Sequence, residues 1–383
     1  MTVNFDPTDA ERELVQMARA QARIAQRYAR HFDRHHDERV PDELPEARDH
    51  PNVRARMKEL MHETSGAPIA DILVYMEEIA GGVPFRANSN ESVFLGSRLV
   101  QVLGSSEQRV RWAGKRIAIA LTEPGAGSDP SMIRATAVFD DANQQWVLNG
   151  EKIFISLANT CDAAMVFARF VRGDQKGMSI FVVEKGTAGF EVGRQLDKLG
   201  QRAWDTADLS FRNCRLPALS KLDGNMKDTL AIFNASRPLV AAIGLAYARS
   251  ALNFTRAQLL EKGHVLDYEA GASGLSALAE RFMRAEASFE AAYLTLLHAK
   301  WHEATRGADK IEAAMTKANA GVVARRVTQE CIALLGAEGA SEEHLLEMWF
   351  RDSRVCDIYE GPGEINRLII AREMLHYSAG ELS

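Results

Sequence analysis

The feature that most constrains the fold is the spacing of apolar residues, which changes twice along the chain. From Asp9 to about Arg116, apolar residues recur three or four positions apart, as in helices that bury one face. Near Ile117 the pattern changes to short runs of β-branched and aromatic residues, and from about Asp223 the helical spacing returns. The chain is therefore predicted to be helical, then β, then helical again.

The β region is expected to contain about eight short strands separated by turn residues. They fall at residues 116–123, 136–139, 145–148, 152–156, 163–171, 178–184, 190–196 and 207–213. Asn149-Gly150 stands between two of them and predicts a two-residue hairpin, because Asn-Gly tolerates the positive φ angles of such a turn.

The flanking regions predict amphipathic helices. In the first, the apolar face begins with Leu14, Met17, Ala18, Ala22 and Ala25, and the helix-breaking segment 42–51 follows. The second predicts helices at 233–259, 275–305, 308–335, 341–350 and 364–377. We expect three domains, 1–116, 117–222 and 223–383, which suits a length of 383 residues.

Composition and charge exclude several classes of protein. Hydrophobic residues make up 46% and charged residues 26%, as in ordinary globular proteins, and the net charge of −6 lacks the basic excess of nucleic-acid binders. The four cysteines form no Cys-x-x-Cys pair, so reduced thiols are expected. No apolar stretch suits a membrane span or a signal peptide, which predicts a cytoplasmic protein.

A glycine-rich segment follows the first predicted strand. The sequence LTEPGAGSD occupies 121–129, and its small residues let a ligand approach the backbone, where amides and the Ser128 hydroxyl can donate to phosphate or carbonyl oxygens. It lacks the lysine of a P-loop and the spacing of a dinucleotide fingerprint. A tight turn without a ligand is the competing interpretation.

Two positions on a later strand suit a flat heterocycle. Strand periodicity places Phe154 and Ser156 on one face, with Ile153 and Ile155 on the other. An aromatic ring beside a hydroxyl offers a packing surface and a hydrogen-bond donor. A core aromatic is the alternative.

Glu360 is the candidate base. It follows an apolar stretch and precedes Gly-Pro-Gly and a predicted helix, so its carboxylate can be partly desolvated, which raises the pKa toward that of a base for carbon acids. A solvated surface glutamate is the alternative. Arg237, at the start of an apolar helical stretch, could orient a substrate or pair with a carboxylate.

His31 and His35 lie four residues apart in a predicted helix, a spacing that permits metal chelation. The charged residues around them and the lack of a third ligand nearby favour a solvated helix face, so no metal is expected.

These segments, in this order, resemble the acyl-CoA dehydrogenase family. LTEPGAGSD (121–129) and YEGPGEINRLIIARE (359–373) are similar to its two signatures. LNGEKIFIS (148–156) and KLGQRAWDTADLSFRNCRLP (198–217) are similar to its middle-domain pattern, and SRPLVAAIGLA (236–246) to its first C-terminal helix. The resemblance spans nearly the whole chain.

The resemblance implies an α+β fold: an N-terminal helical domain, a middle antiparallel β domain that binds FAD, and a C-terminal four-helix bundle. Glu360 matches the glutamate that removes the α-proton of an acyl-CoA while the β-carbon gives hydride to the flavin, which yields the trans-2-enoyl-CoA. Some members carry this base immediately before the arginine that matches Arg237, and that position here is Ser236.

The same resemblance assigns the remaining site residues. Those expected to contact FAD are Leu121, Thr122, Gly127, Ser128, Phe154 and Ser156. Those expected to contact the substrate are Ser128, Arg237, Tyr359 and Gly361.

Three segments depart from the family pattern, at 259–271, 333–339 and 362–363, and by resemblance they fall on the adenosine-diphosphate side of FAD. Glu338 is expected to add negative charge near the pyrophosphate. The expected assembly is a homotetramer, or a heterotetramer in which a paralogous subunit supplies the missing FAD contacts. In either case the enzyme is expected to pass its electrons to electron-transferring flavoprotein. The alternative is a subunit that keeps the fold but is non-catalytic or shares its FAD with a partner chain.

Overall fold

The computed structural model describes residues 5–41, 44, 46, 55–57, 59–60, 63–64, 69–82, 91–224, 226–271, 274–377 and 381. Contacts divide the chain into two compact units. The helical unit comprises Met1–Ser89, Lys198–Ala203 and Asn234–Ser383, and the β unit comprises Asn90–Asp197 and Trp204–Phe233. The division into three domains at 117 and 223 stays a prediction.

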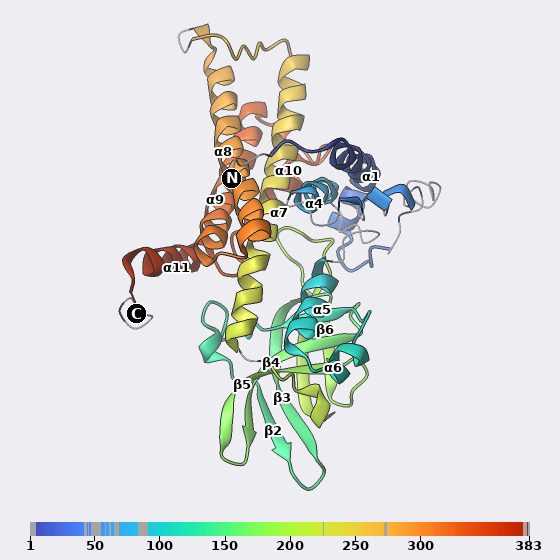
Figure 1. The fold of residues 1–383 in the computed structure, drawn as a ribbon. Helices are drawn as coiled ribbons and strands as arrows, with labels where there is room; N and C mark the ends of the chain where they lie inside the picture. Colours follow the sequence, from blue (N-terminus) through green and yellow to red (C-terminus); the bar gives the residue numbers. More distant parts are fainter. Residues whose placement is uncertain are drawn as a thin grey trace. The chain divides into compact units, whose positions relative to one another are not determined.

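The β unit is a seven-stranded sheet with two helices, α5 (Glu91–Leu103) and α6 (Ser106–Arg111) (Figure 1). Its strands are β1 (Ile117–Ala120), β2 (Thr136–Asp140), β3 (Gln145–Ser156), β4 (Ala163–Arg172), β5 (Gln175–Glu184), β6 (Phe190–Gln195) and β7 (Thr206–Pro217). The strand order is β1-β4-β2-β3-β7-β6, and β5 pairs with β4. The sheet was expected to be antiparallel, but β4 runs parallel to both β1 and β2.

The predicted Asn149-Gly150 hairpin is wrong. The two strands expected on either side of it form one strand, β3, and Gly150 lies at a register shift in its pairing with β7. The β2–β3 connection is instead the turn at 141–144, where Asp140 accepts hydrogen bonds from Asn143. A bulge needs the same backbone freedom as a hairpin turn, which explains why glycine occurs here. Gly150 also allows close packing, because a Cβ at this position would lie only 2.5 Å from the Cβ of Ala135.

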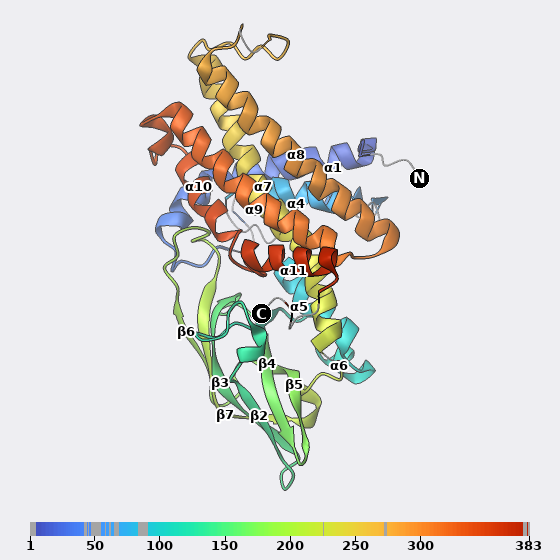
Figure 2. The ribbon, with the colours of Figure 1, turned by 90° about the vertical axis from the view of Figure 1, so that its left-hand side faces the viewer.

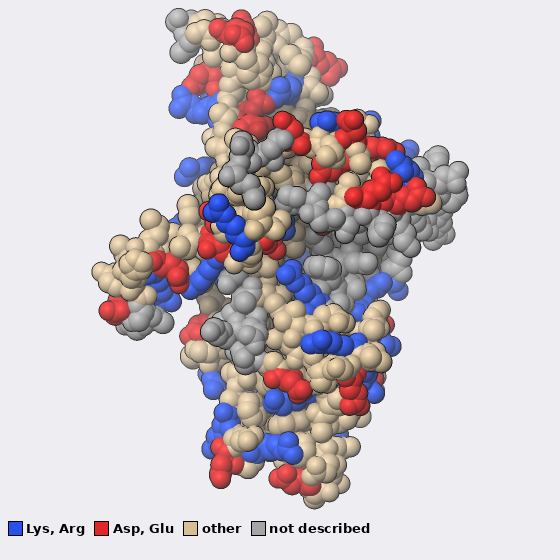
Figure 3. Space-filling model, in the orientation of Figure 1, with Lys and Arg blue, Asp and Glu red and all other residues tan. Residues whose placement is uncertain are grey.

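The core of the β unit forms because alternate residues of each strand are apolar. Trp146 of β3 is buried between Phe139 and Phe181, with ring centroids 4.9 and 5.2 Å apart in edge-to-face geometry. Two short 3₁₀ helices, η1 (Pro130–Met132) and η2 (Ala218–Ser220), complete the unit. On the face drawn in Figure 3, acidic and basic side chains are interspersed over this unit.

The helical unit contains α1 (Asp9–Arg34), α4 (Ala70–Ala80), α8 (Ala277–Arg306), α9 (Lys310–Leu335), α10 (Leu346–Val355), α11 (Gly363–Leu375) and the 3₁₀ helix η4 (Glu338–Ala340). Helix α7 (Met226–Glu261) begins in the β unit and continues into this one. Helices α7, α8 and α9 run alongside one another in both views (Figures 1 and 2). The predicted C-terminal helices are thus present, although α7 begins at 226 rather than 233.

Helix α1 is fixed at both ends. Thr8 and Glu11 form a reciprocal capping box at its start. Near its other end, the buried Asp33 accepts two hydrogen bonds from Arg351 of α10, at 2.9 and 2.6 Å, and its carbonyl accepts one from Arg202. Residues from three separate stretches of the chain therefore meet at Asp33.

The four cysteines are buried and free, as predicted. Within the described residues, none of the helices combines the length and apolar character that crossing a bilayer requires.

Candidate active site

The glycine-rich segment is anchored by a buried ion pair in the β unit. Glu123 accepts from Lys152 Nζ at 2.8 Å and from the backbone amides of Arg134 and Ala135 at 2.7 and 3.0 Å. Burial opposes ionisation of Glu123, but these donors hold its pKa below the ordinary value. Burial lowers the pKa of Lys152. The Glu123–Lys152 ion pair connects β3 to the glycine-rich segment that follows β1 and fixes the start of that segment.

Beyond this anchor the segment is open. The carbonyls of Leu121 and Thr122 accept from Lys152 Nζ and the amide of Ile153, both at 2.9 Å. Gly127 and Ser128 are exposed, and a Cβ built on Gly127 would meet nothing within 4 Å. The backbone at Gly127 is therefore accessible, and the binding of a ligand there stays a prediction.

Phe154 and Ser156 are both exposed on β3 and Ile155 between them is buried, in the sense that the sequence predicted. Regular alternation does not extend further back, because Lys152 is also buried and the pairing with β7 shifts between Lys152 and Ile155. Phe154 is 61% exposed and has a φ of 59°, at the second register shift between β3 and β7. A bulky residue rarely adopts this conformation. Here the strand places an aromatic ring in solvent instead of in the core.

Glu360 lies in the turn between α10 and α11. It is partly buried and has a φ of 54°, and Gly361 follows with a φ of 90°. A non-glycine residue in the left-handed region costs free energy and persists only where its surroundings hold it. The turn at Glu360 therefore depends on the contacts around it.

Two buried side chains of the helical unit hold this turn. Lys317 of α9, which is 1% exposed, donates through Nζ to the carbonyls of Asp357 at 3.1 Å and Gly361 at 2.6 Å. Asn366 of α11, which is fully buried, donates to the same Gly361 carbonyl at 2.7 Å. The backbone on both sides of Glu360 is thus fixed by side-chain donors.

The carboxylate of Glu360 has its own partner, Ser236 of α7, whose hydroxyl donates to Oε2 at 2.5 Å. Burial raises the pKa of Glu360, while the Ser236 hydrogen bond and the charges of Lys317 and Arg237 act in the opposite direction. Burial also lowers the pKa of Lys317 to about 8. The turn therefore presents a carboxylate that is easier to protonate than a solvated glutamate.

Arg237 does not begin a helix, as the sequence suggested, but lies inside α7 next to Pro238. Burial lowers its pKa, which the charge of Glu360 opposes. Tyr359 directs its hydroxyl toward Gln201 and Cys356, at 3.5 and 3.8 Å, and burial raises its pKa well above the ordinary value.

The negative charge expected at Glu338 is compensated, because Lys262 forms an ion pair with it. Both residues lie in the segments that depart from the family pattern.

Each unit therefore gathers one group of predicted site residues. Leu121, Thr122, Gly127, Ser128, Phe154 and Ser156 belong to the β unit, and Arg237, Tyr359, Glu360 and Gly361 belong to the helical unit. Sequence reasoning missed the supporting residues Glu123, Lys152, Lys317 and Asn366. Three of these, Glu123, Lys152 and Asn366, stand inside motifs quoted above, which was a signal that they matter.

The helical unit presents a carboxylate of raised pKa, and the β unit presents an open glycine-rich loop and an exposed aromatic ring. Comparison with known proteins identifies the family. The acyl-CoA dehydrogenase middle-domain profile matches residues 118–214, and the C-terminal-domain profile matches 226–375.

Individual relatives of this chain point to the same family. The chain is 34% identical over 276 residues to acryloyl-CoA reductase (NADH) of Anaerotignum propionicum, which covers 70% of this chain and 68% of that protein. It is 33% identical over 333 residues to human short-chain specific acyl-CoA dehydrogenase, mitochondrial, which covers 83% and 79%. A Mycobacterium smegmatis glutaryl-CoA dehydrogenase solved in complex with FADH2 has the same fold, with a TM-score of 0.81 and 23% identity over 97% of this chain and 96% of that one.

The chain therefore belongs to the acyl-CoA dehydrogenase family, as its motifs predicted. The predicted fold, enzyme class and FAD cofactor are confirmed at the level of the family, whose members include an oxidoreductase acting on acyl-CoA and a protein solved with FADH2.

Proposed function

We propose that this protein is an FAD-dependent dehydrogenase that oxidises an acyl-CoA thioester to the trans-2-enoyl-CoA, with Glu360 as the base. The observation that carries the proposal is the environment of Glu360, a partly buried carboxylate of raised pKa held in a strained turn by Lys317 and Ser236. A base for a carbon acid needs a proton affinity close to neutral pH and a fixed position. The raised pKa of Glu360 and the hydrogen bonds that fix its turn support this role.

Four residues of the helical unit have separate roles in the proposed proton transfer. Glu360 takes the proton from the carbon beside the thioester, and the Ser236 hydroxyl orients the carboxylate through Oε2. The positive charges of Lys317 and Arg237 favour the ionised form of Glu360, which is the form that accepts a proton. In the opposite direction, which the name of the acryloyl-CoA reductase relative describes, the same residue would return the proton.

The residues of the β unit fit FAD. The exposed ring of Phe154 and the hydroxyl of Ser156 suit a planar ring system, and the open backbone at Gly127 and Ser128 suits a phosphate. Leu121 and Thr122 stand where the glycine segment begins. When bound, FAD supplies the acceptor for the hydride that leaves the β-carbon.

The substrate contacts follow from the same proposal. Ser128, Arg237, Tyr359 and Gly361 would contact the acyl-CoA, and electron-transferring flavoprotein would receive the electrons. A homotetramer is the proposed assembly, since the Lys262–Glu338 ion pair removes the charge conflict expected on the diphosphate side. The alternative is an FAD-sharing or non-catalytic subunit of a heterotetramer, which the departures at 259–271 and 333–339 favour.

The decisive test is Glu360→Gln, with Glu364→Gln on the exposed first turn of α11 as the matched control. Both proteins should fold and bind FAD alike, but Glu360→Gln should lower the rate of flavin bleaching by an acyl-CoA about 10²–10⁴-fold. Bleaching at the rate of the unmodified protein would rule out Glu360 as the base.

The visible spectrum of the chain purified alone separates the two assemblies. A stoichiometric flavin band would support a self-sufficient enzyme. A colourless protein that gains flavin only when a second chain is co-expressed would support the shared-FAD alternative.

A further inference from the structure

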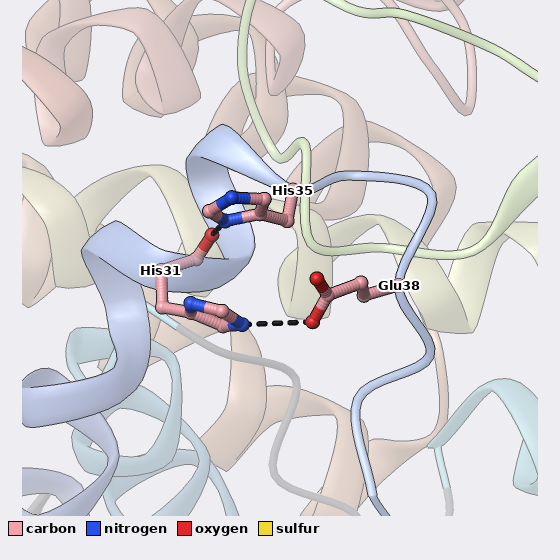
Figure 4. Close-up of side chains that lie close together, drawn as sticks. All are labelled: His31, His35 and Glu38. Carbon is pink, nitrogen blue, oxygen red and sulfur yellow. Dashed lines mark hydrogen bonds and ion pairs between the residues drawn. The ribbon is translucent and has the colours of Figure 1, made fainter.

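A cluster of metal-ligating side chains lies at the C-terminal end of α1, in the helical unit and apart from the residues described above. His31 and His35 project from the last turns of the helix, and Glu38 projects from the turn that follows it (Figure 4). One ligand atom from each of the three lies within 4.8 Å of the others. Glu38 is thus the third ligand that sequence reasoning did not find.

The two imidazole rings are stacked on each other. Their ring centroids are 4.5 Å apart with an interplanar angle of 29°. His35 donates through Nδ1 to the backbone carbonyl of His31 at 2.9 Å, a hydrogen bond that fixes the tautomer in which Nε2 carries the free lone pair. Metal-bound histidines commonly have their second nitrogen occupied in this way.

Glu38 is fixed relative to the same pair. Its Oε2 lies 2.8 Å from His31 Nε2, and its amide donates to the carbonyl of His35 at 3.0 Å. A metal ion with bond lengths of about 2.0–2.2 Å needs ligand atoms separated by about 3.3 Å, so the exposed side chains must rotate to bring the three ligand atoms together.

The charges around the cluster are compatible with a cation. The C-terminal end of a helix carries partial negative charge, which favours a positive ion. The neighbouring Arg34 is paired with Glu342, so its charge is compensated.

We propose that His31, His35 and Glu38 bind one divalent transition-metal ion of the Zn²⁺ class. Two imidazoles and one carboxylate suit Zn²⁺, Cu²⁺ or Ni²⁺, whereas Ca²⁺ and Mg²⁺ prefer oxygen ligands alone. All three ligands are exposed, so the remaining coordination positions are open to water or to an added ligand. The site is independent of the proposed dehydrogenation.

The test is calorimetric titration of the full chain, freed of metal with a chelator, with Zn²⁺ in a buffer that does not coordinate it. We expect one saturable site per chain. His35→Ala and Glu38→Gln should each weaken binding about tenfold or more, since even partners outside the ligand set contribute 10–100-fold. His264→Ala, which alters a histidine outside the cluster, should bind as the unmodified chain does.

A second readout is chemical. Zn²⁺ should protect His31 from modification by diethyl pyrocarbonate, and Mg²⁺ at the same concentration should not. The proposal would be overturned if the unmodified chain had no saturable Zn²⁺ site, or if the His35→Ala and Glu38→Gln proteins bound Zn²⁺ as tightly as the unmodified chain does.

Discussion

Replacing Lys317 by methionine should separate catalysis from stability. Lys317 donates to the carbonyls on both sides of Glu360, and its charge lies near that carboxylate. Methionine keeps the apolar volume of the side chain but removes both donors and the charge. The exposed Lys310, at the start of the same helix, provides the matched control, Lys310→Met.

The expected loss of stability is small because two contributions oppose each other. Hydrogen bonds from a charged donor stabilise by about 1.5–3 kcal/mol each, and two are lost. Burying the ammonium costs about 3 kcal/mol, which corresponds to lowering its pKa from 10.5 to about 8 at about 1.4 kcal/mol per pH unit, and methionine removes that cost. The net change in unfolding free energy should therefore be about 0–3 kcal/mol.

Catalysis has no such compensation. Without Lys317 the strained turn loses a restraint on both sides of the base, and a displacement of about 1 Å can lower a rate about 10²-fold. We expect acyl-CoA to reduce the flavin of the Lys317→Met protein about 10–100-fold more slowly, measured by stopped-flow bleaching, with urea unfolding followed in parallel. Bleaching at the rate of Lys310→Met would refute the positioning role.

The pH dependence gives a second check on Lys317. Its folded pKa lies below its unfolded value, so the unfolded chain binds more protons between about pH 8 and 10.5. Stability of the unmodified chain should therefore rise over this interval relative to that of Lys317→Met. A constant difference in unfolding free energy would contradict the lowered pKa.

Three further predictions concern the other supporting residues. Ser236→Ala removes a donor that lowers the Glu360 pKa, so the acid limb of the kcat/KM profile should move to higher pH, whereas Ser236→Thr should leave it in place. Glu123→Gln leaves Lys152 buried without its charge partner and should lower the unfolding free energy by about 3–5 kcal/mol at pH 7. Because the folded pKa of Glu123 is lowered, that difference should shrink as the pH falls through it, and equal urea midpoints at pH 7 would refute the ion pair's role. Phe154→Ala should weaken FAD binding about tenfold in a fluorescence titration with little change in unfolding free energy, since the ring is exposed, and unchanged affinity would remove Phe154 from the site.

The sequence predicted the elements well where periodicity decides them. Helical spacing located α8 and α9 within a few residues. Phe154 and Ser156 are both exposed as expected, but the irregular pairing of β3 between Lys152 and Ile155 was not predicted. Asn149-Gly150 misled because Asn-Gly marks a need for backbone freedom without saying whether the chain turns or bulges there.

The residues that hold the site were not predictable from local pattern. Lys317 occurs in an alanine-rich helix, where a lysine normally indicates the solvent side, and only the tertiary structure shows that it is buried against the Glu360 turn. Glu38 lies beyond the end of α1, so helical spacing gives no reason to place it beside His31. Both depend on contacts between separate segments, which sequence periodicity does not encode.

The Asp33–Arg351 pair has a consequence for how the chain is made. The two residues are 318 positions apart, so at a synthesis rate of roughly 5–20 residues per second about 15–60 s pass between the emergence of α1 and that of its partner. The β unit can acquire its contacts during this interval, since its residues are complete by Phe233. Helix α1 must therefore wait for α10, and a nascent protein halted before Arg351 would hold a folded sheet and an unfinished helical unit.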